Sequence, residues 1–106
     1  MKALTIKEIL ESCGGEFFGE EKYLNTQVTS IVTDSRKATK DSMFVAIKGE
    51  RSDGHKFVAG TYESGAVCAL VEEALDCPIP QIKVASTLNA VKDIARYYRS
   101  LFKVPF

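Results

Sequence analysis

The sequence predicts an α/β fold with a small, mostly parallel sheet flanked by helices. Short apolar runs typical of buried strands alternate with stretches in which apolar residues recur at helical spacing. Two of the expected strands, at 28–32 and 43–47, run directly into polar loops. In α/β proteins, loops outside the strand ends form the ligand sites, so these two loops are where we look for function.

The composition fits one compact domain covering residues 1–106, since such domains most often hold about 100–150 residues. Basic and acidic residues are equal at 14 each, which argues against a general nucleic-acid binder. No window approaches the roughly 20 apolar residues of a membrane helix, and the N-terminus has no apolar signal core. Three irregularly spaced cysteines and one histidine argue against a zinc site, and free thiols fit a reducing compartment. We therefore expect a cytoplasmic protein without a metal, nucleic-acid or membrane partner.

The helix expected at 6–13 has the clearest signals. Thr5 and Glu8 have the spacing of a capping box, and Gly14 is placed to end the helix. Ser86 or Thr87 is expected to cap the last helix. The other expected elements are strands at 16–18, 28–32, 43–47, 66–71 and 81–84, a helix at 55–64 with Phe57, Val58, Thr61 and Tyr62 on one side, and a last helix with the apolar stripe Leu88, Val91, Ala95, Tyr98, Leu101 and Phe102.

Residues 103–106 read as the start of another buried strand. This indicates that the 106 residues are a fragment of a longer protein.

The two polar loops carry the candidate binding residues. Between residues 36 and 56 there are six Lys or Arg against three Asp or Glu, which fits an anion site, although a solvated face explains the excess equally well. Hydroxyls, cations and glycine backbone together suit an oxygen-rich or phosphorylated small molecule. The expected binding residues are Thr33, Asp34, Ser35, Arg36, Lys48, Gly49, Glu50, Arg51, Ser52 and Asp53.

No catalytic residue is predicted. His55 has two interpretations. It could be a catalytic base, or either Asp53 or His55 could cap the helix that begins there. The cap is favoured because no nucleophile partner for a triad is evident. Ser35 lacks the G-x-S-x-G setting of a nucleophile elbow, and the chain contains no G-x-x-x-x-G-K-[ST] loop. The cations Lys92, Arg96, Arg99 and Lys103 are more often a solvated helix face than a phosphate clamp.

Beyond these patterns, the chain carries a recognisable succession of motifs: T-D-S-R-K-x-x-K-D-S-M-F-V-A-I-K-G-E-R-S-D-G-H-K-F, followed by E-S-G-A-V-C-A-L-V. Over essentially its whole length it resembles the amino-terminal domain of the Mur ligases, the ATP-dependent enzymes that extend the peptide of the peptidoglycan precursor. One departure is Lys40-Asp41-Ser42, which stands where the family usually has Pro-Gly-Asp.

The resemblance implies that this domain holds the UDP end of UDP-N-acetylmuramoyl-tripeptide. By matching motif positions, Thr33 and Ser35 would face the uridine, and Glu50, Arg51 and Ser52 would lie beside the nucleotide or sugar. ATP and Mg²⁺ would bind a central domain that these 106 residues lack, so the partners would be the substrate and the missing central and C-terminal domains.

Within the family, G-E-R-x-D-G-H and A-R-Y-Y-R-S-L-F-K-V-P are more similar to the members that add D-alanyl-D-alanine. The members that add the third peptide residue are the nearest alternative. A free-standing, non-catalytic α/β binding module is the alternative of a different class.

Overall fold

The computed structural model of the chain describes residues 2–47 and 54–101. Its elements, in chain order, are β1 (Leu4–Thr5), α1 (Ile6–Cys13), β2 (Glu16–Phe18), the 3-10 helix η1 (Glu21–Asn25), β3 (Gln27–Val28), β4 (Ser30–Val32), η2 (Ser35–Lys37), β5 (Ser42–Val45), η3 (Gly54–Phe57), α2 (Val58–Glu63), β6 (Cys68–Val71), β7 (Gln81–Lys83) and α3 (Thr87–Ser100).

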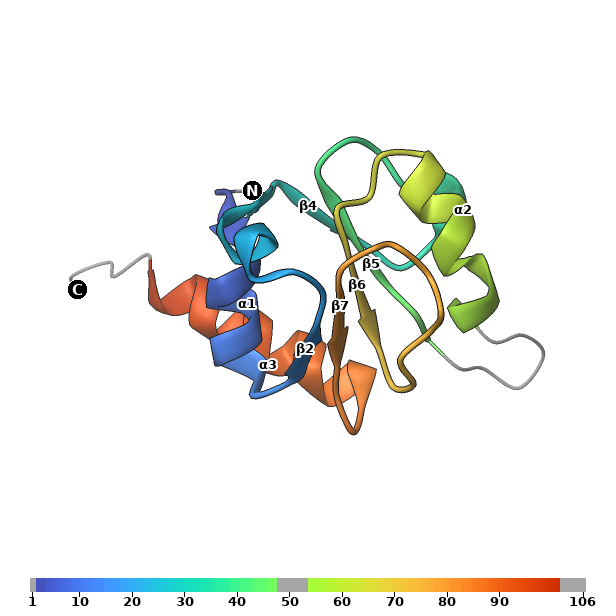
Figure 1. The fold of residues 1–106 in the computed structure, drawn as a ribbon. Coiled ribbons are helices and arrows are strands. Elements are labelled where there is room, and N and C mark those ends of the chain that lie inside the picture. The colour runs from blue at the N-terminus through green and yellow to red at the C-terminus, as the bar shows by residue number, and fades with distance from the viewer. Residues whose placement is uncertain (1, 48–53, 102–106) are drawn as a thin grey trace.

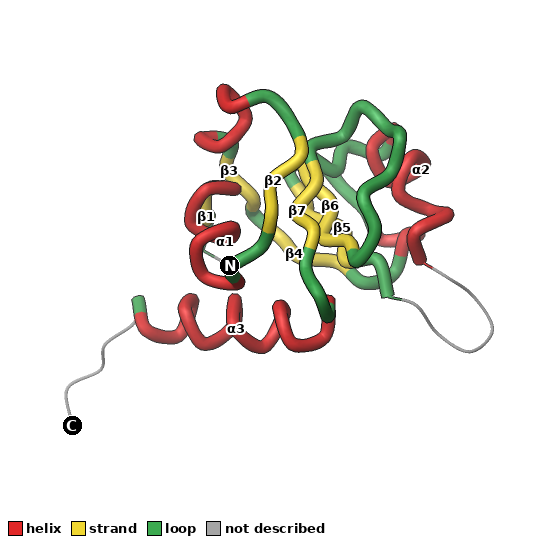
Figure 2. The backbone as a smooth tube through the Cα atoms, turned by 60° about the horizontal axis from the view of Figure 1, so that its bottom comes forward, coloured by secondary structure: helices red, strands yellow, loops and turns green. Residues whose placement is uncertain are grey.

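One five-stranded sheet organises the molecule, in the order β2-β7-β6-β5-β4. Neighbours from β4 to β7 are parallel, and only β2 pairs antiparallel, with β7. The helices α1 and α3 cover one face of this sheet and α2 covers the other (Figure 1, Figure 2). The predicted α/β fold with a mostly parallel sheet is therefore confirmed.

The central strands supply a core on each face because successive side chains of a strand point to opposite sides. Met43 and Val45 of β5 pack with the α1/α3 face, whereas Phe44 between them packs with the α2 face. All four residues of β5 and all four of β6 are buried, as expected of strands covered on both sides. The core under α1 and α3 consists of Leu4, Ile6, Ile9, Val28, Met43, Val45, Cys68, Leu70, Ile82, Ala90 and Ile94.

The predicted ends of α1 are confirmed. The Glu8 N–H donates to Thr5 Oγ1 at 3.1 Å and the Thr5 N–H donates to Glu8 Oε1 at 3.0 Å, which completes the capping box. Gly14 ends the helix at φ 65°, in the left-handed region that favours glycine. The Tyr97 hydroxyl of α3 donates to Glu8 Oε2 at 2.7 Å, so the same carboxylate also joins the two helices. The Thr5 N–H and this hydroxyl hold the pKa of Glu8 below its usual value.

The single strand predicted at 28–32 is wrong. The segment forms two short strands in different sheets, because β3 pairs with β1 and β4 pairs with β5. Thr29 lies between them, and its N–H donates to the Asp41 carbonyl oxygen at 2.8 Å. Asp41 itself has φ 62°, an angle that glycine adopts more easily. The turn where the sequence departs from Pro-Gly-Asp thus keeps the left-handed backbone without the glycine.

The buried faces predicted for the last two helices are also partly wrong. In α2 the buried residues are Val58 and Thr61, whereas Phe57 and Tyr62 are 40% and 44% exposed. In α3 the buried residues are Thr87, Ala90 and Ile94, whereas Leu88, in the predicted stripe, is 57% exposed. Val91, Tyr98 and Leu101 of the predicted stripe are half-buried and do pack against the core, so the stripe adjoins the most buried sector of α3 and partly shares its contacts. Phe102 and residues 103–106 lie outside the described residues.

Candidate functional site

The parallel pairing of β4 and β5 directs the two predicted loops to one edge of the sheet. Val32 is opposite Phe44, so Thr33 and Ile47 both leave the sheet at its carboxyl edge. The second loop, with the predicted residues Lys48, Gly49, Glu50, Arg51, Ser52 and Asp53, lies outside the described residues. Its two flanks are described, and the Gly54 N–H donates to the Ile47 carbonyl oxygen at 2.9 Å.

Gly54 allows this contact because a Cβ there would lie 2.7 Å from the Ile47 nitrogen. Such a distance is too short for any other residue without a shift of the backbone. The D-G-H motif therefore has a structural reason at its glycine, which closes the base of the second loop.

The first loop is built around a salt bridge between Asp34 and Arg36. The Asp34 carboxylate accepts from the Arg36 backbone N–H at 3.0 Å, and it accepts from Arg36 Nε and Nη2 at 3.1 and 2.9 Å. The Arg36 side chain and backbone together lower the pKa of Asp34 to about 2. Two of the five side-chain N–H groups of Arg36 donate to Asp34, and the Arg36 side chain is 87% exposed. Asp34 thus shapes the loop, while Arg36 still presents charge to solvent.

A cavity of about 280 Å³ lies where η2 faces η3 and α2. Ser35 and Arg36 line one side, and Lys56 and Phe57 line the other. The Lys56 ammonium lies 5.1 Å from the centroid of the Phe57 ring, which is close enough for a cation–π interaction. One hydroxyl, two cations and an exposed ring together offer what a nucleotide needs, hydrogen bonding, phosphate attraction and stacking.

Sequence reasoning predicted Ser35 and Arg36 but missed Lys56 and Phe57. Phe57 was assigned to the buried side of the helix because it falls at helical spacing with Thr61. The usable signal was its position two residues after His55, at the start of the helix that follows the second loop. Thr33 is exposed directly after β4 and does not line the cavity.

His55 is buried, with 8% of its surface exposed, and serves as a hydrogen-bond acceptor. Its Nε2 accepts from the backbone N–H of Glu72 at 2.9 Å and of Glu73 at 3.4 Å. His55 lies inside η3, which makes the helix-cap interpretation of this residue wrong, and its structural role is instead to tie the base of the second loop to the end of β6.

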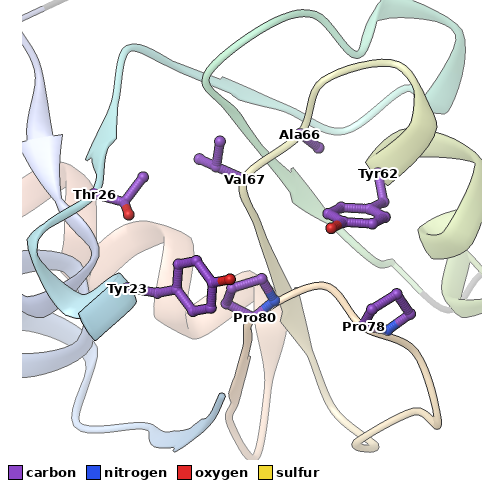
Figure 3. A pocket seen from close by; sticks show the side chains of 7 residues that line it. All are labelled: Tyr23, Thr26, Tyr62, Ala66, Val67, Pro78 and Pro80. Atoms are coloured by element: carbon purple, nitrogen blue, oxygen red, sulfur yellow. The ribbon is translucent and has the colours of Figure 1, made fainter. Parts of the chain in front are cut away.

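A second cavity, of about 150 Å³, lies at the opposite edge of the sheet. Tyr23 of η1 and Tyr62 of α2 contribute rings, and Pro78 and Pro80 border it just before β7 (Figure 3). This edge holds the amino ends of β6 and β7, whereas ligands of parallel sheets bind outside the carboxyl ends. The cavity beside Ser35 is therefore the better candidate for a nucleotide.

Within residues 2–47 and 54–101, no group of three or more His, Cys, Asp and Glu side chains is arranged to hold a metal ion. No helix there is long and apolar enough to cross a membrane.

Comparison with known proteins gives one family match. The model of the family described as "Mur ligase family, catalytic domain" matches residues 27–99. The UDP-N-acetylmuramoyl-tripeptide–D-alanyl-D-alanine ligase of Escherichia coli is 34% identical over 99 residues, which is 93% of this chain and 21% of that protein. The UDP-N-acetylmuramoyl-L-alanyl-D-glutamate–2,6-diaminopimelate ligase of Cytophaga hutchinsonii is 43% identical over 65 residues, covering 56% of this chain and 13% of that protein.

Solved structures agree. The crystal structure of MurF from Acinetobacter baumannii superimposes with a TM-score of 0.86 at 33% identity, covering 95% of this chain and 22% of that one. The chain therefore spans about a fifth of the length of the E. coli ligase and of the A. baumannii MurF.

Proposed function

We propose, because the chain belongs to the Mur ligase family, that it is the amino-terminal, UDP-binding domain of a ligase that joins D-alanyl-D-alanine to UDP-N-acetylmuramoyl-tripeptide. The chain matches relatives named for this reaction over 93% of its own length. Diaminopimelate ligases match over 56% to 77% of the chain, which favours the first assignment over a third-residue-adding ligase. A free-standing binding module remains the alternative of another class.

The observation that carries the proposal is the cavity shared by η2 and α2. Ser35 and Phe57 both line this cavity. The Ser35 hydroxyl would hydrogen-bond the uracil edge, and the Phe57 ring would stack on the base. Arg36 and Lys56 bring positive charge to the same cavity, where a diphosphate would be attracted. Thr33 and Asp34 complete the first loop.

The second loop is proposed to contribute further contacts with the same ligand. Glu50, Arg51 and Ser52 would lie beside the nucleotide or sugar, with Lys48, Gly49 and Asp53 at the ends of the loop. These assignments rest on motif positions in the sequence.

In the longer ligase, ATP with Mg²⁺ would phosphorylate the tripeptide carboxylate, giving ADP and an acyl phosphate. The amine of D-alanyl-D-alanine would then attack the acyl carbon, form the new amide and release inorganic phosphate. The 106 residues lack a G-x-x-x-x-G-K-[ST] loop, and phosphoryl transfer needs positioned cations around the γ-phosphate. The ATP site is therefore assigned to the remaining domains, and the chain's own part is to hold the UDP end of the substrate in the cytoplasm.

An NMR titration of the chain with UDP and with uridine tests the binding role. Both ligands should shift the amide signals of residues 33–37 and 54–61. Ser35→Ala should weaken UDP and uridine equally, whereas Arg51→Ala should weaken UDP more, by about 1.5–3 kcal/mol for a lost charge-assisted hydrogen bond. Lys92→Ala, on the far polar side of α3, is the control. No shift at millimolar UDP would refute the binding role.

A phosphate-release assay tests the assignment to a ligase. The 106-residue chain should not turn over ATP. Joined to the following domains, it should release phosphate only when both UDP-N-acetylmuramoyl-tripeptide and D-alanyl-D-alanine are present. Turnover with a free amino acid in place of D-alanyl-D-alanine would point to a different member of the family.

A further inference from the structure

We propose that an apolar groove between α3 and the strands β1 and β4 is the docking surface for the domain that follows this one in the longer ligase. The groove has a volume of about 230 Å³ and lies away from the candidate nucleotide site. It is called the α3 groove below. Its lining residues are Leu4, Ile31, Val91, Ile94, Ala95 and Tyr98.

The α3 groove exists because α3 is apolar on two adjoining sectors. One sector, with Ala90 and Ile94, is buried against α1 and the sheet. Successive helix residues turn by about 100°, so Leu88, Val91 and Ala95 fall on the next sector. Leu88 and Ala95 on that sector are exposed, whereas Val91 is half-buried and, like Tyr98 further along the helix, packs partly against the core. The groove therefore has an exposed apolar rim at Ala95 beside side chains that the core already holds.

The groove is preformed. Leu4 and Ile94 form a floor that is 1% and 2% exposed, so the core holds it in place. The Tyr98 hydroxyl accepts from the Lys2 N–H, which fixes the ring that forms one wall. Among the described residues, no charged side chain lines the groove, in contrast to the cavity with Arg36 and Lys56, so it suits apolar side chains rather than a phosphorylated ligand. This geometry fits a protein side chain as the occupant.

The occupant we infer is the following domain of the same protein, so the inference rests on the proposed function. The chain spans only 21% of its relatives' length, and most of such a protein lies outside the matched part. The described chain leaves α3 at Leu101, directly after the last turn that carries Tyr98. A domain continuing from there begins beside the groove, where covalent linkage gives it a high effective concentration.

Cysteine labelling tests the proposal with a matched pair of neighbouring positions. Ala95→Cys places a thiol on the groove, and Arg96→Cys places one on the polar sector beside it, where the Arg96 side chain is 82% exposed. Each variant is made in the 106-residue chain and in the longer ligase, and maleimide labelling is followed by peptide mass mapping. Mapping separates the new thiol from Cys13, Cys68 and Cys77.

In the 106-residue chain both variants should label at similar rates. In the longer ligase the Ala95→Cys variant should label about tenfold more slowly, because a docked domain must open first. The Arg96→Cys variant should keep its rate in both proteins.

Equal Ala95→Cys rates in the short and long proteins would overturn the proposal. Slower labelling of the 106-residue chain as its own concentration rises would also overturn it, because the occupant would then be a second copy. Failure of UDP to bind, together with protection of Ala95→Cys in the longer protein, would reject the nucleotide role and still support the groove.

Discussion

The α1/α3 face of the sheet is held by two capped helices joined to each other, whereas the α2 face is covered by one six-residue helix without a side-chain cap. Glu8 receives three hydrogen bonds from α1 and α3 groups on the first face. On the second face, Phe57 and Tyr62 remain exposed. The first face is therefore tied together by a hydrogen bond between its two helices, whereas the second leaves aromatic side chains exposed.

The largest expected effect is the loss of stability when a buried isoleucine is replaced by alanine, and one isoleucine on each face allows a comparison. Ile9 of α1 is 0% exposed and Ile79, before β7, is 1% exposed. Ile9→Ala should reduce the free energy of unfolding by about 3–5 kcal/mol and Ile79→Ala by about 2–3 kcal/mol, because the cost depends on how far the site can collapse. Urea unfolding measures both. A greater loss from Ile79→Ala would place the more important core on the α2 face.

Backbone strain at Asp41 should have the next largest effect. The Asp41 N–H donates to the carbonyl oxygen of Gly65, which follows α2, so Asp41 is linked to the α2 face of the sheet. Asp41→Val should cost about 1–2 kcal/mol, because a β-branched residue resists the left-handed backbone at φ 62°. Asp41→Gly should leave stability unchanged or slightly higher. Thermal unfolding checks this order, with Lys40→Val as the control that should change little.

Removing the hydroxyl of one tyrosine on each face compares how much a single side-chain hydroxyl contributes to stability there. Tyr97→Phe removes the hydrogen bond to Glu8 and should cost about 0.5–1.5 kcal/mol. Tyr62→Phe, at a ring 44% exposed on the α2 face, should cost nothing measurable. Chemical denaturation of the two variants in parallel gives the answer. Equal costs would mean that the Tyr97–Glu8 bond does not hold the helices together.

The smallest expected effect is a dependence of the folded protein's stability on pH, through the Asp34 carboxylate in the loop after β4. The pKa of Asp34 is lowered from 3.8 to about 2, so the folded form favours the ionised carboxylate. The stabilisation it contributes is complete above about pH 4 and is lost as pH falls through about 2. Carbon-detected NMR of the Asp34 carboxyl should show a midpoint near 2, rising toward 3.8 in Arg36→Gln. An unchanged midpoint in the variant would exclude the salt bridge as its cause.

Sequence reasoning succeeded where one local signal decides the structure. The capping box at Thr5 and Glu8 and the glycine at Gly14 define α1 without help from the rest of the chain. The buried runs of β5 and β6 were equally clear, since every position in them is covered. Register then follows from parallel pairing, which brings the predicted site loops to one edge.

Sequence reasoning failed where the local structure or the buried position depends on residues far away in the chain. The orientation of α3 is decided by contact with α1, and helical spacing could not tell Ala90 from Val91 as the buried position. The break at Thr29 depends on a hydrogen bond to Asp41, twelve residues away. His55 looked like a cap because its partners, Glu72 and Glu73, follow only after another helix and strand. Phe57 was missed as a site residue for the same reason.

The hydrogen bond between Ile47 and Gly54 also bears on how such a domain can change over evolution. It joins backbone atoms at the two ends of residues 48–53. The entropy of closing a loop rises only slowly with length, by about 0.6 kcal/mol per doubling, so insertions between these two residues are inexpensive. A Mur ligase domain could therefore change the residues between Ile47 and Gly54 in number and kind while the sheet that carries them stays intact.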